Sequence, residues 1–232
     1  MNLLAFDSST ESLSIALARP VDGIWQVWDY VGAGGAQASS SLIPNIFALL
    51  RRAGIGLPQL GAIAFGQGPG SFTGLRTACS VAQGLAFGAG IPLLPVDTLL
   101  AVAEEARYLQ SGGALCFPVL ALLDARMDQV YAAKYAYAAG QWTRQGEHQL
   151  VAPEDLEPSP VLAGNAFAVY AERLACAPGA RRIEALPTAT AMLRLAPALL
   201  AAGLAVAPEQ AWPAYVRDKV AKTTQERSDE KR

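Results

Sequence analysis

A glycine-rich segment at residues 66–74, GQGPGSFTG, is the feature that most narrows the fold of this chain. It joins an apolar run, LGAIAFG, to a stretch of small residues, LRTACSVAQGLAFG, which predicts a strand, a tight turn and a closely packed helix. Such a turn presents free backbone amides to an anion, although it is neither a Walker A loop nor a GxGxxG fingerprint. The alternative is conformational: glycines for positive φ, Pro69 for rigidity, and Ser71 or Thr73 as the N-cap.

The first forty residues predict three strands followed by a helix. The apolar run at 3–6, the alternating stretch at 12–17 and the aromatic stretch IWQVWDYV at 24–31 all have strand character. Because the turns between them are short, we expect an antiparallel meander. Ser40 or Ser41 is the expected N-cap of the next helix, which has one broad apolar face.

The second half begins with a similar order of expected elements, an apolar strand that ends at an aspartate and a second strand close behind it. PVLALLDA at 118–125 predicts a strand that ends at Asp124, QVYAAKYAY at 129–137 a returning strand, and VLAGNA at 161–166 a later one. A further helix is expected from Thr188 to Leu199. We therefore predict an N-terminal lobe at 1–110, a smaller lobe at 111–216 that begins at the flexible SGG, and a polar, disordered tail at 217–232.

Composition excludes several classes of protein. Apolar residues make up 52% of the 232 residues and the net charge is -2, so a large core is expected but no broad basic surface for a polyanion. The start of the chain does not have the pattern of a secretory signal, and no apolar run is long enough to span a bilayer, so we expect a cytoplasmic protein. The three cysteines form no CxxC pair. His148, the single histidine, lies in a polar stretch that we interpret as a strand edge or a loop, and it is expected to be solvated. No metal site is predicted.

Three segments have residues that are suited to chemistry. The DSST turn and the glycine-rich turn predict a phosphate or nucleotide site, and a second carboxylate opposite the first would hold magnesium through water. The two turns also have an ordinary explanation as capped turns. For the segment of the second carboxylate we favour an ordinary strand-turn-strand in which Arg126 and Asp128 are solvated. The residues of this predicted site are Asp7, Ser8, Gly68, Gly70, Ser71 and Asp124.

The order of these segments resembles the TsaB (YeaZ) family. The resemblance is carried by LLAFDSSTESLSIAL, AFGQGPGSFTGLRTACSVAQGLAFG, LLPVDTLLAVA, ALLDARMDQVYAA and PAYVRDKVA, and it extends to about residue 220. It implies an α/β, two-lobed actin-like ATPase fold of the sugar kinase, Hsp70 and actin type. Each lobe would be built on an RNase H-like mixed sheet, and the second lobe would be truncated.

The resemblance also implies a function. The chain would be a non-catalytic scaffold that binds and activates TsaD, together with TsaE and a threonylcarbamoyl-adenylate synthase. The complex forms threonylcarbamoyladenosine next to the anticodon of tRNAs that read ANN codons, so contact with tRNA would be indirect. Two helices, at about 41–53 and 72–88, would pair with TsaD, or with a second copy when TsaD is absent. The contact residues expected there are Leu42, Ile46, Leu49, Thr73, Leu75, Arg76, Cys79, Ala82 and Ala86.

The first of these helices supports the non-catalytic assignment. TsaD carries a metal-holding histidine pair there, whereas SSSLIPNIFALLRRAG has no histidine, and Gln37 and Ala38 stand where many family members keep one. We expect no resident cofactor, with ATP and magnesium at the partner interface as the alternative. The rival function is an independent ATP-dependent phosphotransferase that uses Asp7 and Asp124. A glycoprotease-like hydrolase is disfavoured because no activated nucleophile is evident.

Overall fold

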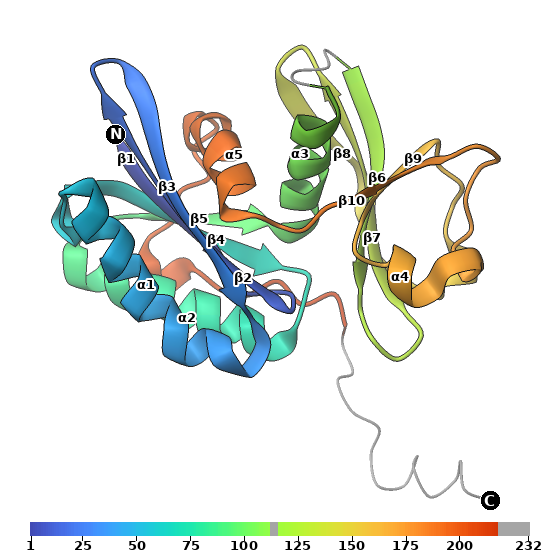
Figure 1. Ribbon diagram of the computed structural model, residues 1–232, viewed down its shortest axis with the longest axis horizontal. Helices are drawn as coiled ribbons and strands as arrows, with labels where there is room; N and C mark the ends of the chain where they lie inside the picture. The colour runs from blue at the N-terminus through green and yellow to red at the C-terminus, as the bar shows by residue number, and fades with distance from the viewer. Residues whose placement is uncertain (112–115, 218–232) are drawn as a thin grey trace, which may run out of the picture.

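The computed structural model describes residues 1–111 and 116–217, which form two five-stranded mixed sheets with helices outside and between them (Figure 1). The first sheet has the order β3-β2-β1-β4-β5 and the second the order β10-β9-β6-β7-β8. In each, the first three strands form an antiparallel meander, and the fourth and fifth run parallel to the first. The first sheet consists of β1 (Asn2–Asp7), β2 (Ser12–Val21), β3 (Ile24–Ala33), β4 (Leu60–Gly68) and β5 (Leu93–Asp97). The second consists of β6 (Cys116–Asp124), β7 (Val130–Ala138), β8 (Gln141–Val151), β9 (Val161–Gly164) and β10 (Arg181–Glu184).

The shared strand order confirms that the two halves repeat one plan, which the sequence indicated only faintly. It also confirms the expected two-lobed actin-like ATPase fold with RNase H-like sheets. Strand β10 was not predicted, and the stretch of β8 was interpreted as a strand edge or a loop. The stretch that contains β8 is polar because β8 is an edge strand with most of its side chains exposed. The four residues of β10 include two arginines and a glutamate.

Two helices cover the outer face of the first sheet. α1 (Ala38–Ala53) begins before the predicted caps, because the hydroxyls of Ser40 and Ser41 donate to the carbonyl of Gln37 instead of capping the helix. α2 (Phe72–Ala89) begins one residue after Ser71, whose hydroxyl accepts from the amide of Gly74 at 3.5 Å. The predicted cap at Ser71 is therefore confirmed.

Two further helices lie between the sheets, and each belongs in sequence to the opposite lobe (Figure 1). α3 (Thr98–Ser111) follows the first sheet but packs against β6 and β9 of the second. α5 (Ala189–Ala201) is capped by Thr188, as predicted, and packs against β1 and β2 of the first sheet. The lobes thus exchange their last helices.

The second lobe is the smaller one, as the resemblance implied. Where the first lobe has α1 and α2 on the outer face of its sheet, the described part of the second lobe has α4 (Phe167–Tyr170) and short 3₁₀ turns. The 3₁₀ segments of the described residues are η1 (Gly35–Gln37), η2 (Leu57–Gln59), η3 (Pro153–Asp155), η4 (Ala171–Arg173) and η5 (Pro208–Gln210). Among the described residues, no helix combines the length and apolar character needed to cross a bilayer.

Most of the predicted lobe boundary at 111–113 and of the predicted tail at 217–232 lies outside the described residues. Two residues are exceptions. Ser111 is the last residue of α3, and Arg217 forms hydrogen bonds with the second lobe. Its guanidinium donates to the carbonyl of Ala125 and to the side chain of Gln129. Residues 211–217 form an extended strap that runs from α2 to this contact.

Candidate functional site

The DSST turn places Asp7 inside the protein. Its side chain is only 1% exposed. Oδ1 accepts hydrogen bonds from the amide and hydroxyl of Ser9, at 2.9 and 2.7 Å, whereas Oδ2 has no partner among the described residues. Oδ2 lies against Gly66, where an added Cβ would be 1.8 Å away. Burial raises the pKa of Asp7 to about 7, against the opposing effect of the Ser9 hydrogen bonds.

The glycine-rich turn packs directly on the DSST turn. The amide of Ser71 donates to the carbonyl of Ser9 at 2.7 Å, and the hydroxyl of Ser8 donates to the carbonyl of Gly74 at 2.8 Å. A Cβ on Gly74 would lie 1.8 Å from the Ser8 carbonyl oxygen, and one on Gly70 would lie 2.6 Å from the Cβ of Ser9. The glycines are therefore required by this close approach, which supports the conformational explanation of the motif.

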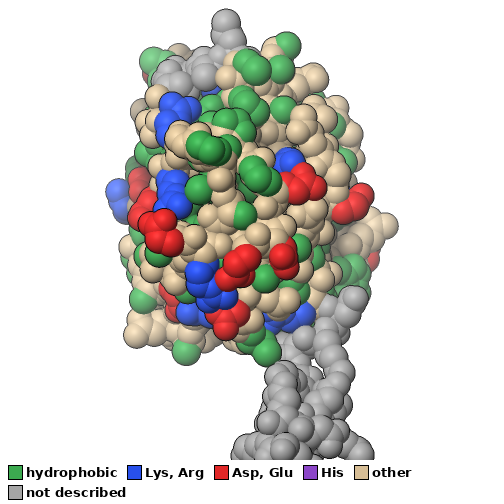
Figure 2. All heavy atoms as spheres, turned by 90° about the vertical axis from the view of Figure 1, so that its right-hand side faces the viewer, with side chains coloured by type: hydrophobic (Ala, Val, Ile, Leu, Met, Phe, Trp, Pro, Cys, Tyr) green, Lys and Arg blue, Asp and Glu red, His purple; other side chains and the backbone are tan. Residues whose placement is uncertain are grey.

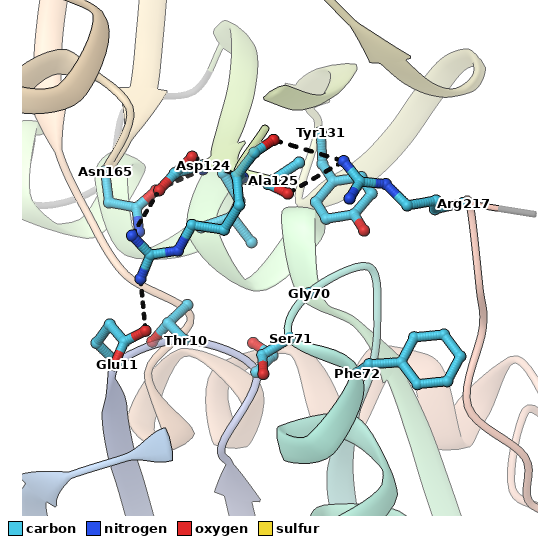
Figure 3. Close-up of a pocket in the computed structure, with 13 residues that line it drawn as sticks. Thr10, Glu11, Gly70, Ser71, Phe72, Asp124, Ala125, Tyr131, Asn165 and Arg217 are labelled. Atoms are coloured by element: carbon cyan, nitrogen blue, oxygen red, sulfur yellow. Dashed lines mark hydrogen bonds and ion pairs between the residues drawn. The ribbon is translucent and has the colours of Figure 1, made fainter. Parts of the chain in front are cut away.

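A cavity of about 230 Å³ lies between the lobes beside these turns (Figure 3). Asp124 lies at the end of β6, on the upper side of the cavity in Figure 3. The Oδ1 of Asp124 accepts hydrogen bonds from the hydroxyl of Tyr170 and the amide of Arg126, both at 2.8 Å. Asn165 accepts from the amide of Asp124 at 2.9 Å. The lining residues are Ser9, Thr10, Glu11, Gly70, Ser71, Phe72, Leu123, Asp124, Ala125, Arg126, Tyr131, Asn165 and Arg217.

Both arginines of the cavity are engaged with protein groups. Arg126 spans the lobes to Glu11, with 2.6 Å between Nη2 and Oε1, and its Nη1 is 3.4 Å from the carboxylate of Asp124. Arg217 donates to the Ala125 carbonyl at 3.1 Å (Figure 3). It also donates to the side chain of Gln129 at 2.7 Å, so it holds the β6–β7 loop at two points. The charge of Arg126 is thus paired with the carboxylates of Glu11 and Asp124, whereas Arg217 donates to uncharged oxygens. Both arginines link distant segments of the chain.

The structure brings only part of the predicted nucleotide site together. Gly70, Ser71 and Asp124 line the cavity, whereas Asp7, Ser8 and Gly68 do not. Asp7 does not share the cleft with Asp124, because Asp7 is buried beneath the turn and faces Gly66. The amide of Gly68 donates to the hydroxyl of Thr98 at 3.0 Å. The cavity is also smaller than the roughly 300–1,000 Å³ that is typical of ligand pockets. Its residues therefore do not fit magnesium held by these two carboxylates with a nucleotide.

Sequence reasoning missed the residues that close the cavity. Arg126 was expected to be solvated, and its side chain is 65% exposed, but its ion pair with Glu11 was not foreseen. Glu11, Tyr131, Asn165 and Arg217 were not singled out. PAYVRDKVA contains Arg217 and was noted only for its resemblance. Nothing local in the sequence indicates that this arginine reaches the β6–β7 loop.

The contact residues predicted on α1 and α2 need correction. Among the nine, only Thr73 and Arg76 are exposed, and the Nε of Arg76 donates to the hydroxyl of Tyr215 in the strap at 3.2 Å. The other seven pack into the chain's own core, each at most 4% exposed, and cannot reach a partner: Leu42, Ile46, Leu49, Leu75, Cys79, Ala82 and Ala86. The outer sides of the two helices instead expose Ile43, Phe47, Ser80, Gly84 and Phe87.

His148 is not the solvated residue that the sequence predicted. Its Nε2 lies 2.9 Å from Oδ2 of Asp97, which also accepts from the hydroxyl of Tyr135 at 2.6 Å. Oδ1 of Asp97 accepts from the amide of Leu99 at the start of α3. The cluster thus links β8 to the start of α3. Among residues 1–111 and 116–217, no three His, Cys, Asp or Glu side chains gather as a metal site would need.

The end of the molecule formed by the second lobe carries acidic and basic side chains among one another (Figure 2). This mixture agrees with the net charge of -2. It does not form the one-sided basic surface that is typical of direct nucleic-acid binding.

Comparison with known proteins gives consistent results. The family model described as "TsaD: tRNA N6-adenosine threonylcarbamoyltransferase" matches residues 35–229. The tRNA threonylcarbamoyladenosine biosynthesis protein TsaB of Escherichia coli K12 is 34% identical, over 95% of this chain and 96% of that protein. TsaB of Haemophilus influenzae is 39% identical over 56% of this chain and 52% of its own length. The solved structure of YeaZ from Pseudomonas aeruginosa superposes with a TM-score of 0.81 at 36% identity, covering 93% of this chain and 99% of that one. The chain belongs to the TsaB (YeaZ) family.

Proposed function

We propose that this protein takes part in the synthesis of threonylcarbamoyladenosine in tRNA, as a non-catalytic subunit that binds TsaD. The role in this pathway is supported by the match to TsaB of Escherichia coli over nearly the full length of both chains. TsaE and tRNA bind to the complex and not directly to this chain. The synthesis takes place in the cytoplasm. Without TsaD, the same helix face binds a second copy of the chain.

The exposed side of the α1–α2 layer is the observation that carries the scaffold assignment. The inward side chains of both helices are buried against the sheet, yet large apolar side chains also point outward. Phe47 on α1 is 40% exposed and Phe87 on α2 is 79% exposed, with Ile43 one turn before Phe47. Exposed aromatic side chains on one helical layer are typical of a surface that a partner covers.

The chemistry of the cleft supports a non-catalytic role. Asp7 is buried outside the cavity, and both cavity arginines pair with groups of the chain itself. α1 contains no histidine, so the metal-holding pair of TsaD has no counterpart on it. These features favour the scaffold over the phosphotransferase.

The test is co-purification with TsaD of the same organism, followed by a threonylcarbamoyl-transfer assay with each protein alone and with the mixture. We expect co-elution, and activity only in the mixture. Phe47→Glu and Phe87→Glu should abolish co-elution without unfolding the chain, because both side chains are exposed. Val169→Glu on α4 is the matched control, since Val169 is also exposed but lies on the second lobe.

Two outcomes would contradict the proposal. One is intact co-elution of both variants, which would show that TsaD binds elsewhere. The other is ATP turnover by the isolated chain that is lost in Asp124→Asn, which would favour the phosphotransferase. Ala82→Glu is unsuitable as a test, because Ala82 is fully buried and a charge there would destabilise the monomer.

A further inference from the structure

The β6–β7 loop, residues 125–129, has an unusual backbone. Three consecutive residues in it, Arg126, Met127 and Asp128, have positive φ angles of 61°, 54° and 56°. None of them is a glycine, and a residue with a Cβ is strained in this left-handed region. Such a conformation persists only where surrounding contacts impose it, and it is frequent in segments that switch between two states.

Hydrogen bonds within the second lobe hold the two ends of this loop. The amide of Ala125 donates to the carbonyl of Gln129 at 2.9 Å, and the amide of Gln129 donates to the carbonyl of Arg126 at 3.1 Å. The hydroxyl of Tyr170 also donates to the carbonyl of Gln129, at 3.0 Å. Within the part of the chain that the structure describes, the two amides between Arg126 and Gln129 have no hydrogen bond. The strained centre of the loop is therefore not held by the loop itself.

Arg217, the last residue of the strap, supplies a contact that reaches the centre. Its Nη1 lies 3.3 Å from the sulfur of Met127. Its Nη2 donates to the carbonyl of Ala125 at 3.1 Å and to the side chain of Gln129 at 2.7 Å. The planar guanidinium presents these donors in a fixed arrangement. One side chain thus joins the first, middle and last residues of the loop.

The strap itself is fixed to the first lobe. The amide of Ala214 donates to the carbonyl of Gln67 at 2.8 Å, and the side chain of Gln67 donates to the carbonyl of Trp212 at 3.0 Å. Gln83 of α2 donates to the carbonyl of Ala211 at 2.9 Å. The guanidinium at the end of the strap therefore reaches the second lobe from a segment that is bound along β4 and α2.

An aromatic stack fixes the strap two residues before Arg217. Tyr215 and Phe72 stack with 4.4 Å between their ring centroids and an interplanar angle of 17°. The Nε of Arg76 donates to the hydroxyl of Tyr215 at 3.2 Å, and its guanidinium lies 4.2 Å from the centre of the Phe72 ring. Because Phe72 and Arg76 belong to the first two turns of α2, a shift of this end of the helix moves the guanidinium that holds the loop.

We propose that the strap is a latch that holds the β6–β7 loop in its left-handed conformation. Release of Arg217 lets the loop relax into a second state. Ala125 and Arg126 of this loop line the cavity between the lobes, so the latch couples the start of α2 to the wall of that cavity. The coupling is a property of the isolated chain, and it can hold or fail whatever the outcome of the TsaD experiment.

Hydrogen–deuterium exchange on the full chain tests the latch. Arg217→Ala should raise the exchange rates of the bonded amides of Ala125 and Gln129 by about tenfold or more, because the loop opens more often. Trypsin should also cleave faster after Arg126, whose side chain is exposed. Arg181→Ala is the matched control, since this arginine is exposed on β10 of the same lobe as the loop.

Two substitutions at Met127 separate backbone strain from simple loss of a contact. Both Met127→Gly and Met127→Ala remove the sulfur that Arg217 touches. Only glycine also relieves the left-handed conformation, because alanine keeps the Cβ. Arg217→Ala should therefore raise exchange about tenfold in the Met127→Ala background, but less than about threefold in the Met127→Gly background.

Substitutions at Tyr215 test the connection to α2. Tyr215→Ala removes the stack on Phe72 and should raise the exchange rates of the loop by about threefold or more. Tyr215→Phe keeps the stack and should have a smaller effect.

Three results would overturn the proposal: unchanged exchange in Arg217→Ala, an equal rise in both Met127 backgrounds, or no response to Tyr215→Ala. Near-ultraviolet circular dichroism checks that each variant folds. Should Arg217→Ala not fold, Arg217→Lys takes its place, because lysine keeps the positive charge but cannot bind Ala125 and Gln129 through one planar group.

Discussion

Asp7 shows how strongly one carboxyl group depends on its surroundings. An aspartate at the end of the first strand suggested a metal or phosphate ligand, yet here it is enclosed by the DSST turn and Gly66. Its pKa of about 7 means that the buried group keeps its proton under acidic conditions. Position in the sequence predicted the strand end correctly, but burial, which decides the chemistry, depends on the packing of β4 and the glycine-rich turn.

The raised pKa of Asp7 makes stability depend on pH. Between pH 3.8 and about 7 the folded chain holds a proton on Asp7 that the unfolded chain has lost, so stability falls as pH rises through this window. Asp7→Asn keeps an oxygen for the Ser9 hydrogen bonds and removes the titration. We expect it to flatten the decline and to stabilise the fold at pH 8 by roughly 2–4 kcal/mol. Urea unfolding between pH 4 and 8 measures the free energy of unfolding of both proteins. An equally steep decline in Asp7→Asn would refute the prediction. Asp155→Asn, at an exposed position, is the control.

At the scale of elements, α2 contains a glycine that the fold requires and one that it does not. Gly74 lies in the first turn, where a Cβ would be 1.8 Å from the backbone oxygen of Ser8, whereas nothing lies within 4 Å of a Cβ on Gly84. The sequence alone presents both as glycines within one helix. The difference arises from a contact with a segment 66 residues away.

Alanine at each position should therefore have opposite effects. Gly74→Ala must move α2 away from the DSST turn, and we expect a loss of about 2 kcal/mol or more in the free energy of unfolding. Gly84→Ala should stabilise the chain by about 0.5–1 kcal/mol, because alanine restricts the unfolded chain and favours the helix. Thermal and urea unfolding of the two variants test this. Equal effects would mean that the close approach at Gly74 has no energetic importance.

Periodicity predicted the helices and the meander well, but it identifies only the side of a helix that packs inward. Leu42, Ile46 and Leu49 follow the helical repeat and therefore cover the chain's own sheet. Phe47 directly follows the buried Ile46, and Phe87 directly follows the buried Ala86, so both phenylalanines lie beside the buried stripe and are exposed. The stretch of edge strand β8 stayed ambiguous between a strand edge and a loop for a related reason, because its exposed polar residues resemble those of a loop.

At the scale of the whole molecule, the exchanged helices tie the lobes together. α5 covers a layer of small apolar residues on the first sheet, among them Ala5, Ala16 and Ala64. Glu104 of α3 bonds to Arg194 of α5, which further links the two crossing helices. The strand order was not predictable from local patterns, since it depends on pairing between distant segments.

A fragment of residues 1–111 should consequently fail to form the first lobe. Without α5, the sheet face that contains Ala5 and Ala64 would be open to water, and such apolar surface promotes aggregation or a loosely packed state. Near-ultraviolet circular dichroism and binding of a hydrophobic dye to the fragment measure this. A cooperative unfolding transition in the fragment alone would contradict it, and the full chain is the control.

The exchange of α3 and α5 also affects how the protein is made on the ribosome. Domains of many proteins fold in turn, N-terminal first, as the chain emerges. Here the first sheet is synthesised early, but α5, the helix that covers one of its faces, is among the last elements to appear. The nascent first lobe therefore waits with an open apolar face through the synthesis of almost the whole second lobe. Both lobes must mature together near the end of translation, at the stage when chaperone binding would matter most.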